Sequence, residues 1–261
     1  GYASEGETFT VADKNEVWIM ELIGKGKDEM GAVWVARRMP DDMISAHANH
    51  SRIRQFPLKD KENCLYSKDV ISFARKKGYF TGKDKDFSFS EAYAPIDFGA
   101  KRYCEARVWS FFNKWAAEDM KPYLPYAMGE DVNPETKQPI DGIPHEMPLW
   151  VKPKQFLSTQ DVKDMMRDHY EGTPMDITEG LGSLPWNMPY RVTPLSYKVD
   201  GKEYFNERPI STVQSSAIYV AQMRDWLPDY IGGVLWFGND DANMVALTPI
   251  YSCLESVPDC Y

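Results

Sequence analysis

The chain contains 261 residues, 43% of them hydrophobic and 13% aromatic, which is enough to build a sizeable core in one large domain. Its formal net charge of −9 argues against a nucleic-acid partner, because binding a phosphate backbone requires clustered Lys and Arg side chains. No apolar run reaches the roughly 18 residues of a membrane-spanning helix, so no membrane partner is predicted. The compartment stays open: we expect a soluble chain, cytoplasmic or exported, since any targeting segment would precede Gly1.

The N-terminal region predicts a β-meander. Thr8–Ala12 and Val17–Ile23 have the apolar and β-branched content of half-buried strands, and the turn at 13–15 joins them into a hairpin. Ala32–Arg37 predicts a third strand, closed by a Pro-Asp-Asp turn, after which Met43–Ala46 resumes an extended conformation.

Helices are predicted next. Ser67–Lys77 has apolar residues at near-helical spacing and Gly78 as its C-cap, and Phe98–Trp115 has a broad apolar face typical of a longer helix. Pro122–Pro153 is rich in Pro, Gly, Asp and Glu, which indicates a long loop excursion. A third helix is expected from Ser158, which forms a capping-box pattern with a later aspartate.

The C-terminal region returns to strands after a second loop excursion at Gly172–Pro194. Apolar runs bounded by turn residues predict strands at 195–199, 203–205, 217–223, 233–237 and 245–247. Strands, then helices, then strands again indicate the α+β class with largely antiparallel sheets and long loop excursions. We expect one domain over residues 1–261.

One histidine pair has a spacing found in metal sites. His47 and His50 form an HxxH pattern, which zinc ligands use on helices. Here the context is extended, no Glu lies between the two residues to act as a general base, and His145 and His169 are distant in sequence. A structural or hydrogen-bonding role is therefore favoured, and a metal hydrolase using His47 and His50 is kept as an alternative.

Other polar clusters predict no cofactor. Asp84–Ser88 imitates the start of a calcium loop but is followed by Phe89 where that loop needs glycine, and Asn239–Asn243 is better explained by turn hydrogen bonds. Free thiols are favoured over a bridge across the short loop between Cys253 and Cys260. The carboxylates and imidazole of Asp168, His169 and Glu171 could form an acid–base set, although a solvated, capped helix end is favoured.

Several segments together resemble the dipeptidase family of N-terminal-nucleophile (Ntn) hydrolases and, more distantly, penicillin V acylase and bile-salt hydrolase. The first are VWIMELIG and GAVWVARR, followed by ISAHANHSRIR at 44–54. FGAKRYCEARVWSFFNKW at 98–115 is also similar, and so are the segments at 167–176, 207–216, 220–238 and 240–251. The resemblance thus covers nearly the whole chain.

The resemblance implies a fold, a reaction and two site residues. The fold is an αββα sandwich, of which this chain would be the central and C-terminal part. The reaction is metal-free hydrolysis of dipeptides by an N-terminal cysteine, whereas this chain opens with Gly1, so the nucleophile is expected in a missing N-terminal portion. Asn49 would help to form the oxyanion hole, and Arg102, with Arg107 as second choice, would orient charge near the nucleophile.

Two readings remain beside the resemblance. By its residues alone Asn49 is a turn asparagine that caps its own backbone. Aromatic loops around Trp150, Trp186, Tyr190 and Trp226 could instead make the chain a non-catalytic module that binds peptide or glycan. Short peptides are the predicted ligand of the dipeptidase, and its macromolecular partner would be a second copy of the chain or the missing N-terminal portion.

Overall fold

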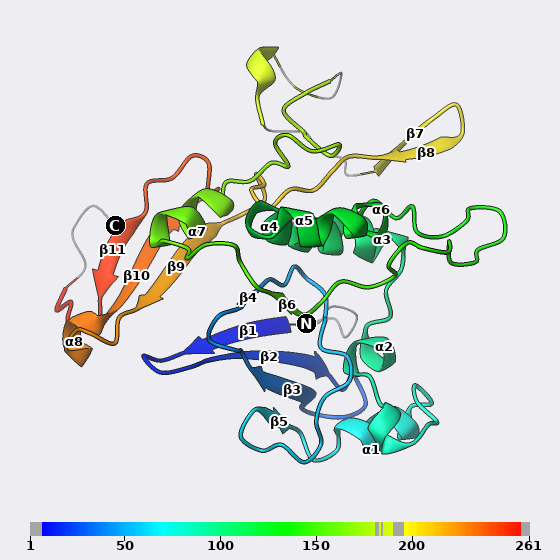
Figure 1. Ribbon diagram of the computed structural model, residues 1–261, viewed down its shortest axis with the longest axis horizontal. Coiled ribbons are helices and arrows are strands. Elements are labelled where there is room, and N and C mark those ends of the chain that lie inside the picture. The colour runs from blue at the N-terminus through cyan, green and yellow to red at the C-terminus, as the bar shows by residue number, and fades with distance from the viewer. Residues whose placement is uncertain (1–6, 181–182, 184, 190–195, 257–261) are drawn as a thin grey trace. The chain divides into compact units, whose positions relative to one another are not determined.

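A computed structural model describes residues 7–180, 183, 185–189 and 196–256, so Gly1, Tyr190 and Cys260 lie outside the described residues. The chain divides into two compact units, Gly1–Lys154 and Gln155–Tyr261 (Figure 1). The expectation of one domain over residues 1–261 stays a prediction.

An antiparallel four-stranded sheet forms the base of the first unit. Its strands are β1 (Glu7–Ala12), β2 (Val17–Gly24), β3 (Ala32–Arg38) and β5 (Cys64–Tyr66), in the order β1-β2-β3-β5. The predicted hairpin and third strand are therefore confirmed. The hairpin turn is fixed by Asp13, whose carboxylate accepts hydrogen bonds from two backbone N–H groups.

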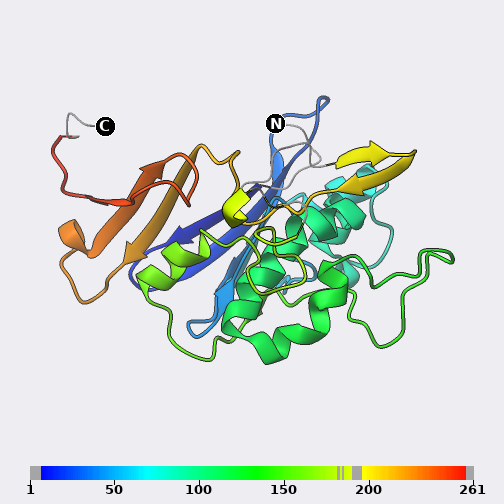
Figure 2. The ribbon, with the colours of Figure 1, turned by 90° about the horizontal axis from the view of Figure 1, so that it is seen from above.

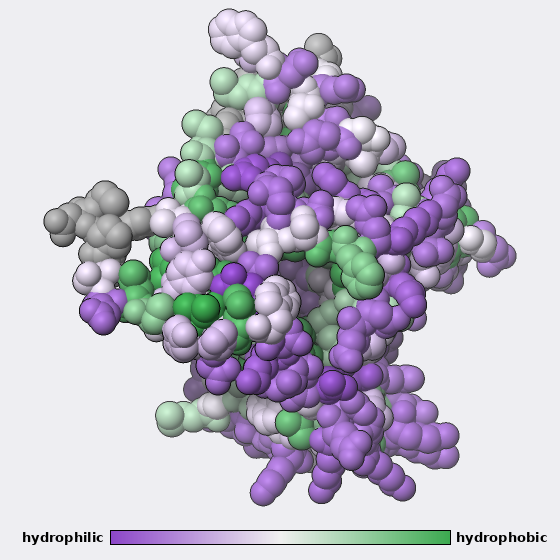
Figure 3. All heavy atoms as spheres, turned by 60° about the vertical axis from the view of Figure 1, so that its left-hand side comes forward, coloured by the Kyte–Doolittle hydropathy of each residue, from purple (hydrophilic) through white to green (hydrophobic). Residues whose placement is uncertain are grey.

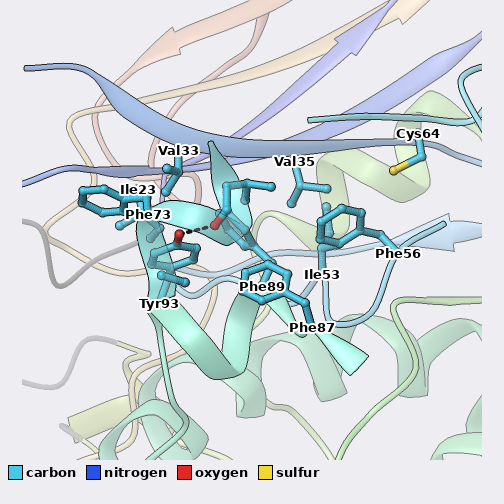
Figure 4. Close-up of a cluster of buried hydrophobic side chains, with 12 residues drawn as sticks. Ile23, Val33, Val35, Ile53, Phe56, Cys64, Phe73, Phe87, Phe89 and Tyr93 are labelled. Atoms are coloured by element: carbon cyan, nitrogen blue, oxygen red, sulfur yellow. Dashed lines mark hydrogen bonds between the residues drawn. The ribbon is translucent and has the colours of Figure 1, made fainter. Parts of the chain in front are cut away.

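One face of this sheet carries the core. Alternation along the strands directs Ile23, Val33 and Val35 to the same side, where they meet the aromatic side chains of α1 (Val70–Lys76) and α2 (Phe89–Tyr93) (Figure 4). Burying one such side chain contributes roughly 1.5–3 kcal/mol. The predicted α1 ends as expected, because Gly78 adopts a φ of 77° and its N–H bonds the carbonyl of Arg75.

The predicted helix at 98–115 is confirmed, but it is interrupted by a π-helical turn. It consists of α3 (Phe98–Ala100), the π-helical residues Lys101–Glu105 and α4 (Ala106–Trp115). The Asp97 side chain caps its start by accepting a hydrogen bond from the backbone of Ala100. Hydrophobic periodicity does not distinguish a single π turn from an α turn, and such turns are frequent at functional sites.

Short elements complete this unit. Helices α5 (Ala117–Met120) and α6 (Leu124–Ala127) follow α4, and the three lie over the strands of the same unit in Figures 1 and 2. The long excursion then returns to pair β6 (Trp150–Val151) with β4 (Ile44–Ser45). This pairing ties the segment after β3 to the end of the excursion. Two short 3-10 turns lie at Asp84–Asp86 and Lys121–Tyr123.

The second unit begins with α7 (Thr159–Met165), whose predicted capping box between Ser158 and Asp161 is confirmed. A further 3-10 segment, Pro185–Asn187, follows. Two antiparallel sheets then form: a hairpin and a three-stranded sheet in the order β11-β10-β9. Their elements are β7 (Ser196–Val199), β8 (Lys202–Phe205), β9 (Ala217–Met223), α8 (Asp229–Gly232), β10 (Gly233–Asn239) and β11 (Thr248–Tyr251).

The strand predicted at 245–247 is wrong, because β11 begins only at Thr248. The guanidinium of Arg167 donates hydrogen bonds to the carbonyls of Ala242 and Val245, at 2.9 and 3.2 Å. These bonds hold the segment in a loop until the ladder with β10 begins. β11 is an edge strand, which is where a strand tolerates its Pro249.

Antiparallel sheets and separate short helices confirm the α+β class. None of the helices in the described part of the chain is both long and apolar enough to cross a membrane. Hydrophilic side chains make up most of the surface drawn in Figure 3, with smaller hydrophobic areas among them.

Candidate active site

A cavity of about 320 Å³ lies in the first unit beside the segment that follows β4. It is lined by Thr8 and Thr10 of β1, Ile19 of β2, and Ser45, His47 and Asn49 of that segment. A volume of this size accommodates a small ligand. Asn49, the asparagine singled out from the sequence, therefore lies on the wall of a space large enough for a small ligand.

Asn49 has a left-handed backbone with φ 55°. Asparagine is one of the few residues that adopts this conformation readily, because its short side chain can bond locally. Its side chain does not cap its own turn: Oδ1 accepts a hydrogen bond from Nη2 of Arg107, at 2.8 Å. The contact joins the segment after β4 to helix α4.

Of the two arginines named from the sequence, the second choice reaches Asn49. Arg107 is half-buried, and its Nε also donates to the carbonyl of Tyr103 at 2.7 Å. Arg102, the first choice, lies in the π-helical turn with only 3% of its surface exposed. Helical spacing places both arginines on one helix but leaves open which of them reaches a distant loop.

A buried carboxylate anchors the same segment from the other side. Glu21 of β2 is fully buried, and its Oε1 accepts hydrogen bonds from the backbone N–H groups of Arg52 and Ile53, at 2.6 and 2.9 Å. Nε2 of His47 lies 2.8 Å from the same oxygen. Bonds of a carboxylate to backbone N–H groups are short and strong. Glu21 was not singled out from the sequence. The available signal was its charge at a core-facing position of a predicted strand, where an apolar residue is expected.

A second buried charge pair continues this network. Arg52 Nε donates to Oε1 of Glu105 at 2.9 Å, and both side chains are 3% exposed. The remaining nitrogens of the guanidinium donate to the carbonyls of Ala46, Pro148 and Leu149. The Arg52 guanidinium also lies 5.5 Å from the ring centroid of Phe112. Arg52 therefore joins its own segment to the helical residues at 105–112 and to the backbone at 148–149.

The two histidines of the HxxH pattern have different surroundings. His47 is bound to Glu21, whereas His50 is buried and lines a separate pocket of about 30 Å³. Burial lowers the pKa of His50, against the charges of Glu105 and Glu21, so its imidazole is neutral at pH 7. No group of three or more His, Cys, Asp or Glu side chains arranged to hold a metal ion occurs within the described ranges.

The end of α7 is solvated only in part: Glu171 is exposed as the sequence favoured, whereas Asp168 and His169 are buried. Asp168 and His169 are 7% and 2% exposed, and Nδ1 of His169 lies 3.0 Å from Oε1 of Glu171. Tyr170, which lies between His169 and Glu171 in the sequence, is buried and has a φ of 66°. Burial acts to raise the pKa of Glu171, but hydrogen bonds from the His169 ring and backbone outweigh it and lower the pKa to about 2.

This lowered pKa predicts an acid-dependent loss of stability. Because the folded pKa of Glu171 lies below its ordinary value of 4.5, the carboxylate stabilises the fold above about pH 4.5, and the contribution is lost as the pH falls toward 2. We expect Glu171→Gln to lower the urea midpoint at pH 6 and to match the wild type near pH 2. Equal midpoints of the two proteins at pH 6 would contradict this, and Glu179→Gln, an exposed residue of the same unit, is the control.

The aromatic residues proposed for a binding module belong to different units. Trp150 lies in the first unit, half-buried, with the Arg37 guanidinium 5.2 Å from its ring centroid. Trp186 and Trp226 lie in the second unit and are 93% and 71% exposed. Neither unit therefore contributes the full predicted set. Among the described cysteines, Cys64 is a buried free thiol. The alternative of a bridge between Cys253 and Cys260 involves a residue outside the described ranges.

Comparison with known proteins assigns the chain to a family. The model of peptidase family C69 matches residues 1–261. The chain belongs to peptidase family C69. The resemblance to the dipeptidase family is thereby confirmed, and the C69 chain is similar to curated proteins with that name. It is 26% identical to a probable dipeptidase of Salmonella dublin, over 94% of this chain and 47% of that protein.

Two further relatives agree. The C69 chain is 24% identical to a probable dipeptidase of Latilactobacillus sakei, over 99% of this chain and 46% of that protein. It is 23% identical to dipeptidase A of Lactobacillus helveticus, over 100% of this chain and 45% of that protein. The chain thus spans about half the length of the curated relatives it matches.

Proposed function

We propose that this chain is part of a thiol dipeptidase and forms one wall of its active site. The observation that carries the proposal is Asn49: it lies in a segment that resembles the dipeptidase family, it lines a cavity of about 320 Å³, and its side-chain oxygen is bonded to Arg107. The membership of the whole chain in peptidase family C69 supports the reaction class. The ligand is a short peptide, and no cofactor takes part.

The proposed reaction uses a cysteine thiol outside these 261 residues. Its sulfur attacks the scissile carbonyl carbon while its own α-amine takes the proton, and the negative charge moves to the carbonyl oxygen. The side-chain amide of Asn49 donates an N–H group to that oxyanion and stabilises it, and Arg102 orients charge at the site. The C–N bond then breaks, the amine leaves with the proton, and water hydrolyses the thioester to release the acid.

The αββα sandwich is part of this proposal. The outer face of the four-stranded sheet also carries apolar residues, among them Phe9 and Val11 of β1 and Leu65 of β5, which are 48%, 58% and 45% exposed. An apolar sheet face that water reaches is expected to pack against another layer. In the proposed dipeptidase, a second sheet formed outside these 261 residues would supply that layer.

The first test is the activity of the chain itself. Because Gly1 offers no side chain and the internal cysteines have no free α-amine, we expect the purified, metal-free chain not to hydrolyse dipeptides. The measurement is release of free amino acid from a set of dipeptides, with a C69 dipeptidase as positive control. Hydrolysis by the chain that disappears in Asn49→Ala would show that the nucleophile lies within these residues.

A further inference from the structure

The geometry points to Arg107 as a positioning residue that sets the direction of the Asn49 side-chain amide, an inference that rests on the proposed function. The starting observation is the 2.8 Å contact between Nη2 of Arg107 and Oδ1 of Asn49. A guanidinium has five N–H donors and no acceptor, so the atom of the amide that faces it has to be the oxygen. The amide NH₂ is the end of Asn49 left to donate.

This orientation matters because the two ends of an amide have opposite effects on an oxyanion. An NH₂ donor stabilises negative charge that develops on the substrate oxygen, whereas a carbonyl oxygen in its place repels that charge. An asparagine without a fixed partner exchanges the two ends by rotation about its terminal torsion, which is broad and roughly two-fold. Arg107 therefore favours the rotamer that a catalytic donor needs.

The guanidinium is itself held in place by the helix. Its Nε donates to the carbonyl of Tyr103 at 2.7 Å, and Tyr103 lies within the π-helical turn. That turn shifts the backbone bonding, so that the N–H of Ala106 reaches the carbonyl of Lys101. One guanidinium thus spans from a π-turn carbonyl to Asn49. A planar fork can do this, whereas the single point charge of lysine cannot.

The anchoring of the backbone is separate from this effect. Glu21 accepts hydrogen bonds from the backbone N–H groups of Arg52 and Ile53, which follow Asn49. Glu21 therefore fixes the backbone conformation of the segment. Arg107 acts on the side-chain torsion of Asn49. Loss of Arg107 is therefore expected to leave the fold in place and to let the two ends of the Asn49 amide exchange.

The test is a double-mutant cycle in the parent dipeptidase, meaning the proposed active enzyme of which this chain is a part. The variants are Asn49→Ala, Arg107→Gln and the double variant. We expect Arg107→Gln to lower kcat about 10-fold, with KM changed less than about 2-fold, and to have no further effect in the Asn49→Ala background. Arg107→Lys keeps the charge but not the fork, and is expected to behave like Arg107→Gln. Arg75→Gln, at an exposed ion pair on α1, is the control for loss of an arginine.

The outcomes distinguish the positioning role of Arg107 from the proposed function of Asn49. Full activity of Asn49→Ala would overturn the proposed function itself. Three other results would overturn the positioning role alone. In the first, Asn49→Ala loses activity but Arg107→Gln keeps the wild-type kcat. In the second, Arg107→Gln lowers kcat equally with and without Asn49→Ala, and in the third, Arg107→Lys is fully active. The side-chain amide signals of Asn49 in the NMR spectrum of the chain give a readout without activity: Arg107→Gln should shift them, and an unchanged position contradicts the inference.

Discussion

Asn49→Asp is expected to reduce kcat of the parent dipeptidase by about 10²–10³-fold, the usual cost of losing one oxyanion-hole donor. Aspartate has the same size, tolerates a left-handed backbone and keeps an oxygen facing Arg107. It has no N–H group to donate and adds a negative charge beside the developing oxyanion. The measurement is kcat and KM on a dipeptide, together with the thermal midpoint.

The design of this substitution separates catalysis from structure. Because the Arg107 contact is kept, the thermal midpoint of Asn49→Asp should stay close to that of the wild type. Asn113→Asp, on helix α4, is the matched control and should leave kcat unchanged. Wild-type kcat in Asn49→Asp would leave Asn49 as a turn residue and remove the observation that carries the proposed function.

Arg52→Met is expected to lower the free energy of unfolding by about 3–5 kcal/mol, because it leaves Glu105 as an uncompensated charge in the interior. Both partners are 3% exposed, so water does not replace the lost contact. The measurement is urea unfolding of the chain, monitored in the first unit. Adding Glu105→Gln should restore part of the loss, since that variant removes the buried charge.

A neighbouring arginine provides the control for this prediction. Arg54 contacts Glu91 and Glu146 at 2.8 and 2.5 Å, but its side chain is 31% exposed and both partners are more exposed still. Ion pairs of that kind contribute about 0–1 kcal/mol. Arg54→Met should therefore be nearly neutral. Equal losses in Arg52→Met and Arg54→Met would mean that burial of the Arg52–Glu105 pair does not determine its contribution.

Local features of the fold could be predicted from the sequence. β9 has the predicted bounds Ala217–Met223, and the capping box at Ser158 and the end of α1 at Gly78 formed as expected. Each depends on residues within a few positions of one another: alternation, a side chain that reaches its own helix, or a glycine with positive φ. The prediction of a strand at 245–247 was wrong because Arg167, far earlier in the chain, donates a hydrogen bond to the carbonyl of Val245.

The candidate site divides in the same way. The sequence by itself determined membership in the dipeptidase family and singled out Asn49, because both are carried by the order of residues in short segments. Only the tertiary structure decided that Arg107 reaches Asn49, and that Glu21 and Arg52 hold the segment around it. These contacts join residues that lie 58, 31 and 53 positions apart. Helical and strand periodicities give the face on which a side chain lies but not the partner that folding brings to that face.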